Sequence, residues 1–205
     1  MGRFFNSENW LWQGFGRIAD YFILSILWLV CSIPVITVGA ASIALYDTVA
    51  HCFRFGEGNM FQRFFSTFRR ELGRGIVLTI LWALIGWLLN VGYQVLTQLG
   101  ADNQVWNVLS IVYFVSLFLP LGVGCWAIAL QSRFTNTLGE LHKNAFALTL
   151  AYLPRTVIIV ALLVLVVNLL YNFLFFIIFV PALMVNFQSM VIEKVFKKYM
   201  PEDEE

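Results

Sequence analysis

Apolar residues along this chain form long blocks, which are separated by short segments that carry the charged residues. A membrane-crossing helix needs about 20 predominantly apolar residues, and most of these blocks approach or exceed that length. The pattern predicts an all-α fold, a polytopic transmembrane helical bundle built as a single domain over residues 1–205. The six predicted spans are residues 17–32, 36–54, 74–96, 105–130, 155–172 and 174–196.

Prolines and segment length set the less obvious boundaries. Pro34 follows the first block, so we expect a tight turn over residues 33–39. Residues 155–196 are almost continuously apolar, and a helix of that length, rising about 1.5 Å per residue, is much longer than one crossing of about 30 Å. Two spans must share this stretch, with their turn either near residues 168–173 or at Pro181.

Three segments have the periodicity of amphipathic helices lying in the membrane surface. They are residues 7–15, 59–73 and 137–150. The second has one apolar stripe, which consists of Phe61, Phe64, Phe65, Phe68 and Leu72. The third begins with a predicted capping box, because Glu140 follows Thr137 at the required spacing of three residues.

The positive charges give an orientation. All 13 Lys and Arg residues lie before the first span, between spans two and three, between spans four and five, or after span six. The positive-inside rule therefore predicts a multi-pass protein of the cytoplasmic membrane with both termini in the cytoplasm. A five-span arrangement is the alternative, and it would leave Lys194, Lys197 and Lys198 outside.

Composition supports a membrane location, since 60% of the residues are hydrophobic and 12% are charged. Such a chain has too little polar surface to cover itself in water. Its three cysteines have no Cys-x-x-Cys spacing, so we expect neither a disulfide framework nor a metal site.

Ionisable residues inside a span are costly and therefore have a partner or a purpose. Asp47 lies within the second predicted span, and His51 follows it at i+4. Asn90 and Gln94 repeat this spacing in the third span. These four residues form a candidate intramembrane polar site, either a proton or cation relay or a set of satisfied hydrogen bonds, and the relay requires the two amides to converge on Asp47.

The chain has no nucleophile motif, no carboxylate cluster and no phosphate-binding glycine loop, so we expect no enzyme activity, no catalytic residue and no cofactor. Nucleic acid is also not an expected partner. Membrane topology and anionic lipid head groups explain the arginines of residues 63–74.

Three short stretches give a further indication: Ser-Ile-Pro-Val-Ile-Thr-Val-Gly at Ser32 to Gly39, Ala-Leu-Tyr at Ala44 to Tyr46, and Lys-Val-Phe-Lys-Lys-Tyr at Lys194 to Tyr199. In these stretches the chain resembles the YesL-like family of bacterial membrane proteins. The family has no agreed biochemical activity. What the resemblance implies is an association with carbohydrate uptake by ABC importers.

Two functions are therefore expected as alternatives. The first is an accessory component of carbohydrate uptake, embedded in the lipid bilayer, that binds the membrane subunits of an ABC importer. Its candidate docking surface is Arg63, Arg69, Arg70 and Lys143 on the cytoplasmic side. The second is a small-solute or ion carrier or channel that uses the polar site around Asp47. Association of the protein with itself as a homo-oligomer also stays open.

Overall fold

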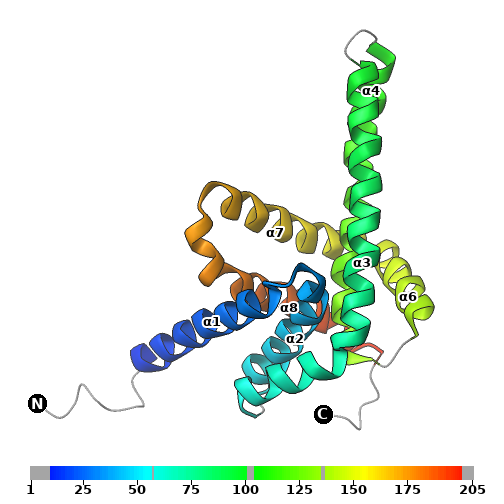
Figure 1. The fold of residues 1–205 in the computed structure, drawn as a ribbon. Coiled ribbons are helices and arrows are strands. Elements are labelled where there is room, and N and C mark those ends of the chain that lie inside the picture. Colours follow the sequence, from blue (N-terminus) through cyan, green and yellow to red (C-terminus); the bar gives the residue numbers. More distant parts are fainter. Residues whose placement is uncertain (1–9, 57, 101–103, 135–136, 200–205) are drawn as a thin grey trace, which may run out of the picture.

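The computed structural model describes residues 10–56, 58–100, 104–134 and 137–199, and within these ranges the fold is all-helical (Figure 1). The elements in chain order are α1 (Trp10–Ser32), η1 (Val35–Thr37), α2 (Val38–Thr48), η2 (Val49–Phe55), α3 (Met60–Gly100), α4 (Gln104–Ser116), α5 (Phe118–Arg133), α6 (Leu138–Ala151), α7 (Leu153–Asn172), η3 (Leu174–Ile178) and α8 (Val180–Phe196).

The first turn of the chain follows from Pro34. This residue precedes the 3₁₀ turn η1, and the hydroxyl of Thr37 donates hydrogen bonds to the carbonyl oxygens of Cys31 at 2.6 Å and Pro34 at 2.7 Å. The bonds connect the end of α1 to the start of α2. Residues 7–9 of the predicted surface helix 7–15 lie outside the described residues, whereas the backbone of residues 10–15 is the start of α1.

The connection from η2 to α3 uses two glycines. Gly56 ends the π-helix η2 with a φ of 71°, and Gly58 has a φ of 76°. Both angles are in the left-handed region, where a side chain is unfavourable. The side chain of Asn59 then accepts a hydrogen bond from the amide of Phe61 at 3.0 Å, as a helix-capping residue does.

Helix α3 is a single element of 41 residues, in which the predicted surface helix 59–73 and the predicted span 74–96 run on without a break. Its first turns lie across the base of the molecule, and the remainder rises away from it (Figure 1). The buried positions of this first part include Phe64, Thr67 and Glu71, whereas Phe61 is 44% exposed and Phe65 is 41% exposed. The inward face therefore differs from the predicted stripe.

The predicted span 105–130 is divided between α4 and α5 at Leu117. Pro120 explains the division, because proline has no N–H to bond the carbonyl four residues earlier and its ring crowds that carbonyl. After it, the predicted capping box is confirmed at the start of α6: the Thr137 hydroxyl accepts from the Glu140 amide, and the Glu140 carboxylate accepts from the Thr137 amide. The Thr137 hydroxyl also donates to Glu140, and these bonds lower the pKa of Glu140.

Helix α2 lies at the centre; from Ala40 to its end at Thr48, and on through Val49 and Ala50 of η2, its residues are buried apart from the partly exposed Ser42. Its closest neighbour is α3, because both helices have a glycine where they cross. A Cβ atom on Gly39 would fall against the carbonyl oxygen of Gly75, and a Cβ atom on Gly75 would fall against the backbone of Ala40. The Gly39 amide also donates to the Thr79 hydroxyl at 2.8 Å. Small residues thus allow the two backbones to touch.

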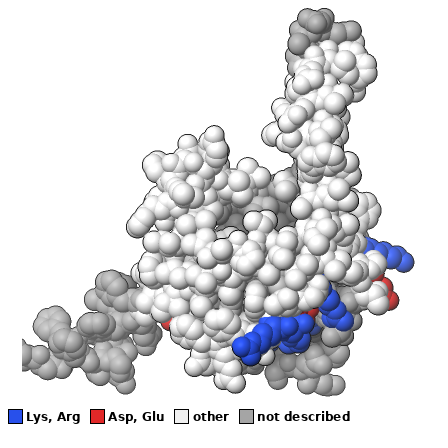
Figure 2. Space-filling view, viewed as in Figure 1, with Lys and Arg blue, Asp and Glu red and all other residues white. Residues whose placement is uncertain are grey.

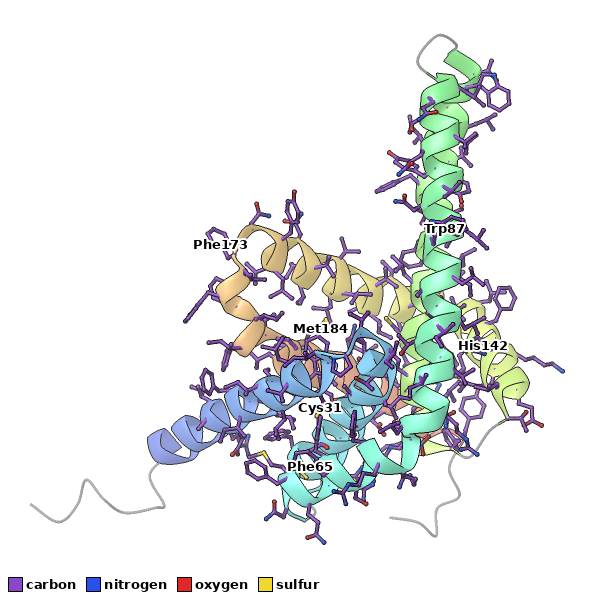
Figure 3. The ribbon with its side chains drawn as sticks, viewed as in Figure 1. Cys31, Phe65, Trp87, His142, Phe173 and Met184 are labelled. Carbon is purple, nitrogen blue, oxygen red and sulfur yellow. The ribbon has the colours of Figure 1, made fainter. Side chains whose placement is uncertain are left out.

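Beyond this crossing, α3 and α4 form an antiparallel pair that projects from the rest of the molecule (Figure 1). We call residues 84–100 of α3 together with residues 104–116 of α4 the arm. Its two helices meet at Gly92, where the ring of Tyr113 packs and the Tyr113 hydroxyl donates to the Leu89 carbonyl at 3.1 Å. The outer surface of the arm is apolar and exposed; Trp87, labelled in Figure 3, is 63% exposed.

The crossing of α2 and α3 predicts a difference between two glycines of the same helix. Gly75→Ala should lower the free energy of unfolding by about 2 kcal/mol, since the added methyl group has no room. Gly86→Ala is the matched control, because nothing lies within 4 Å of its Cβ position. That change should leave stability equal or raise it by up to about 1 kcal/mol. Thermal unfolding of both variants in mild detergent checks the prediction, and equal stability of the two would contradict it.

Candidate functional site

Three buried carboxylates lie at the base of the molecule, on three different helices. Asp47 of α2 is 0% exposed, Glu193 of α8 is 2% exposed and Glu71 of α3 is 4% exposed. A buried charge requires a countercharge and hydrogen bonds. Each of these carboxylates has such partners, and we call the three acids with their partners the base network.

Asp47 is held by α3. The Arg63 guanidinium donates from Nε to Oδ2 at 2.7 Å and from Nη2 to Oδ1 at 3.0 Å, and the Thr67 hydroxyl donates to Oδ2 at 2.6 Å. His51 lies beside the same carboxylate, with Nδ1 3.1 Å from Oδ1. A two-bond arginine–carboxylate pair is the strong form of this interaction. Asp47 is therefore the anchor by which the start of α3 is fixed to α2.

Glu193 makes the second pair, between α8 and α5. Arg133 donates from Nε to Oε1 at 3.1 Å and from Nη2 to Oε2 at 2.8 Å. The Tyr46 hydroxyl of α2 donates to Oε1 at 3.1 Å. Three helices that are far apart in the sequence meet at this one carboxylate.

His51 connects the two pairs. Its Nδ1 lies 2.9 Å from the Asp47 carbonyl oxygen, and its Nε2 lies 2.9 Å from Arg63 Nη2 and 3.2 Å from Arg133 Nη1. The neutral tautomer with the proton on Nδ1 suits these contacts, because Nδ1–H then donates to Asp47 and Nε2 accepts from a guanidinium.

Glu71 completes the base network. Its Oε1 accepts from Arg70 Nε at 3.0 Å, and its Oε2 accepts from the Gln131 amide nitrogen at 2.8 Å. This contact joins α3 to α5. The network therefore connects α2, α3, α5 and α8 through charged and polar side chains.

A pocket of about 570 Å³ opens beside the network. Its lining residues are His51, Arg63, Arg70, Glu71, Arg74, Gln131, Ser132, Arg133 and Phe134. We call it the base pocket. Figure 2 shows Lys and Arg gathered at the lower side of the molecule, whereas the visible surface of the arm carries neither positive nor negative residues. The arrangement can hold an anionic group.

The sequence-predicted polar site is divided by the structure. Asp47 and His51 are brought together with Arg63, a residue that the sequence suggested for the docking surface. Asn90 and Gln94 lie on the exposed arm instead, where the Gln94 amide donates to the Asn90 oxygen at 2.8 Å. The other residues of the predicted docking surface, Arg69, Arg70 and Lys143, are exposed.

Sequence reasoning missed six members of the base network: Tyr46, Thr67, Glu71, Gln131, Arg133 and Glu193. One signal was available for Glu193, because it is an acidic residue at the end of an apolar block and so needs a partner. Glu71 gave no such signal, since it lies in a segment already rich in charged residues. Only the packing of α5 and α8 brings these residues together.

The long apolar helices indicate an α-helical membrane protein. Among the described residues, four segments are long and apolar enough to cross a membrane: Val35–Phe53, Met60–Leu99, Val108–Arg133 and Leu153–Asn172.

Residues 21–93 match the model of a family described as a protein of unknown function, DUF624. YesL-like proteins belong to this family, so the match confirms the resemblance over residues 21–93, which contain the first two of the three stretches. No curated protein and no solved structure matches the chain.

The Asp47–Arg63 pair gives a prediction about stability. Asp47→Asn should lower the free energy of unfolding by about 3 kcal/mol, the low end of the range for broken buried pairs, because Arg63 is partly solvated. Its side chain is 36% exposed. Arg63→Gln should cost as much, since it leaves a buried carboxylate without its countercharge. Unfolding titrations of the purified protein measure both.

The double variant supplies the control for direct coupling. Asp47→Asn combined with Arg63→Gln should cost clearly less than the two single changes added together. Arg69→Gln, which removes an exposed arginine from the same helix, should change stability by less than about 0.5 kcal/mol. Strict additivity of the first two changes would show that the pair does not fix α3 to α2.

Proposed function

We propose that the protein is a non-catalytic accessory component of the cytoplasmic membrane that docks on the membrane subunits of an ABC-type carbohydrate importer. The observation that carries the docking is the arm. Within the described part of the chain, its two mainly apolar helices project from the molecule and pack on each other, and they carry an exposed pair of amide side chains. The carbohydrate part of the proposal comes from the resemblance to YesL-like proteins.

The amide pair distinguishes a docking surface from a surface that only meets lipid. Asn90 is 16 positions beyond Arg74, which at about 1.5 Å per residue is about 24 Å along α3. If Arg74 lies at the cytoplasmic boundary, Asn90 is within a hydrocarbon layer of about 30 Å. Amides at such a depth are stabilised by hydrogen bonds to another helix. Their bond to each other leaves donors and acceptors for a partner protein.

The carrier alternative receives less support from the same contacts. It needs polar side chains that lead away from Asp47 through the apolar part of the molecule. Asp47 is instead engaged by Arg63, Thr67 and His51 at the base, and the amide pair is on the arm. Flux of a solute or protons through reconstituted vesicles, abolished by Asp47→Asn in a folded protein, would nevertheless favour the carrier.

We further propose six spans with both termini in the cytoplasm. The four apolar segments would be joined by α1 and by α8, which have 23 and 17 residues and therefore measure about 34 and 26 Å. The gathering of Lys and Arg at the base supports a cytoplasmic position for that end (Figure 2). The two surface helices, 59–73 and 137–150, would then lie at the cytoplasmic interface.

Cysteine accessibility tests this topology. In a variant without the three native thiols, Asp102→Cys should react with a membrane-impermeant reagent in intact cells, because the segment around it would be outside. Lys198→Cys should react only after the membrane is opened. Residue 102 lies outside the described residues, so this expectation comes from the charge pattern. Labelling of residue 198 in intact cells would support five spans instead.

Co-purification tests the docking. The protein, solubilised gently from cells growing on the relevant sugar, should bring importer membrane subunits with it. A photo-crosslinking residue at Trp87 should capture the same subunits. Replacing Asn90 and Gln94 together by Leu should reduce their recovery at least about fivefold, as expected when interhelical hydrogen bonds worth about 1 kcal/mol are lost.

The matched control is a second exposed amide pair. Asn168 and Asn172 lie at the end of α7, where Asn172 bonds to Asn168. Replacing both by Leu should leave recovery unchanged. If crosslinks form only between copies of this chain, the arm's partner is a second copy and not the importer. If no crosslink forms to an importer subunit or to another copy, the arm faces lipid and the docking proposal is refuted. Crosslinks from Arg69 or Lys143 would show whether the base also takes part.

A further inference from the structure

The base pocket has more positive than negative charge. The base network and the pocket lining contain four guanidinium groups, from Arg63, Arg70, Arg74 and Arg133, and three carboxylates, from Asp47, Glu71 and Glu193. Among these groups of the described residues one positive charge is therefore left over, and the guanidinium groups line a pocket that a small molecule can enter. An anion is the ligand that such a surplus favours.

Arg70 and Arg74 are the groups with donors to offer. Arg70 uses Nε toward Glu71, and its side chain is 55% exposed. Within the ranges that the structure describes, Arg74 has no hydrogen-bond or ion-pair partner. The two residues are at i and i+4 of α3, so they extend from the same helical face. An oxyanion between them receives charge-assisted hydrogen bonds from both guanidinium groups.

Gln131 of α5, which also lines the base pocket, adds a second requirement. Its amide nitrogen is committed to Glu71, because a carboxylate can only accept. The amide oxygen is thereby fixed on the other side, and it is buried without a donor. A buried acceptor without a donor is costly. A hydroxyl group on the anion would supply that donor.

We propose that the base pocket binds a glycerophosphate group, a phosphate ester with a hydroxyl nearby. The phosphate oxygens accept from Arg70 and Arg74, and the hydroxyl donates to Gln131. The volume of about 570 Å³ accommodates such a group. Arg74 opens the predicted span 74–96, at the depth of lipid phosphates. The same chemistry can therefore come from an anionic phospholipid head group or from a soluble ester.

This site is independent of the arm, so its failure would leave the docking proposal intact. Calorimetric titration of the detergent-purified, full-length protein with glycerol 3-phosphate tests the soluble source. Native mass spectrometry of protein exposed to phosphatidylglycerol or to phosphatidylcholine tests the lipid source. We expect saturable binding of at least one of the two ligands, glycerol 3-phosphate or phosphatidylglycerol. If the source is lipid, phosphatidylglycerol should be retained in preference to phosphatidylcholine.

Two arginines of one helix provide the specificity control. Arg74→Gln should weaken binding at least about tenfold, the loss expected for one charge-assisted hydrogen bond of about 1.5 kcal/mol. Arg69→Gln removes the same charge from an exposed position that does not line the base pocket, and it should change affinity less than about twofold. Equal losses in the two variants, or no binding of either probe, would overturn the proposal.

Glycerol 3-phosphate and inorganic phosphate separate the role of the hydroxyl. The ester should bind at least about fivefold more tightly than inorganic phosphate, and Gln131→Met should remove that preference while Arg74 still binds the anion. If inorganic phosphate binds as tightly as the ester to the unmodified protein, the pocket recognises charge alone and the glycerophosphate assignment is wrong.

Discussion

Buried charges that must be paired determine how this molecule is assembled at its base. Asp47 and Glu193 are almost fully enclosed, and an unpaired carboxylate there would cost several kcal/mol. Each is matched by an arginine from another helix, and His51 lies between the two arginines. Displacing any of α2, α3, α5 or α8 would therefore separate a charge from its partner. Apolar packing alone does not select one helix arrangement as strongly, because a displaced helix can exchange one apolar contact for another at little cost.

At the middle of the molecule α2 and α3 cross without an ion pair among the described residues, and close contact of their backbones holds them together instead. Gly39 and Gly75 remove the side chains that would hold the backbones apart. Close backbone contact maximises dispersion and allows the Gly39 amide to reach Thr79. Pairing at the base and close contact at the crossing fix α3 at two points, and among the helices that the structure describes α4 accompanies it along the arm.

The sequence was sufficient for features that depend on local chemistry. Block length indicated membrane-crossing helices, Pro34 indicated the turn between α1 and α2, and the Thr137–Glu140 spacing indicated the capping box. The i+4 spacing also placed His51 beside Asp47. Features that depend on tertiary packing could not be predicted from the sequence. The apolar stripe from Phe61 to Leu72 has helical periodicity. The face of α3 that packs on α2 is nevertheless the one that carries Thr67, because the Thr67 hydroxyl donates a hydrogen bond to the buried Asp47 carboxylate. Arg133 and Glu193 are 60 positions apart, and only the assembled helices make them partners.

Helix α3 carries both proposed surfaces, and its geometry keeps them separate. Arg74 at the base pocket and Asn90 on the arm are about 24 Å apart along the helix. Between them α3 packs on α2 and η1 at a close backbone contact, where a rotation of the helix would drive Gly75 into Ala40. We therefore expect that a ligand bound in the base pocket does not rotate α3 and so does not move the arm. Sites that are far apart and share no partner contribute additively to free energies. The proposed anion binding at one end of α3 and the proposed docking at the other are accordingly expected to be separable, so that each substitution on α3 reports on the surface that it touches.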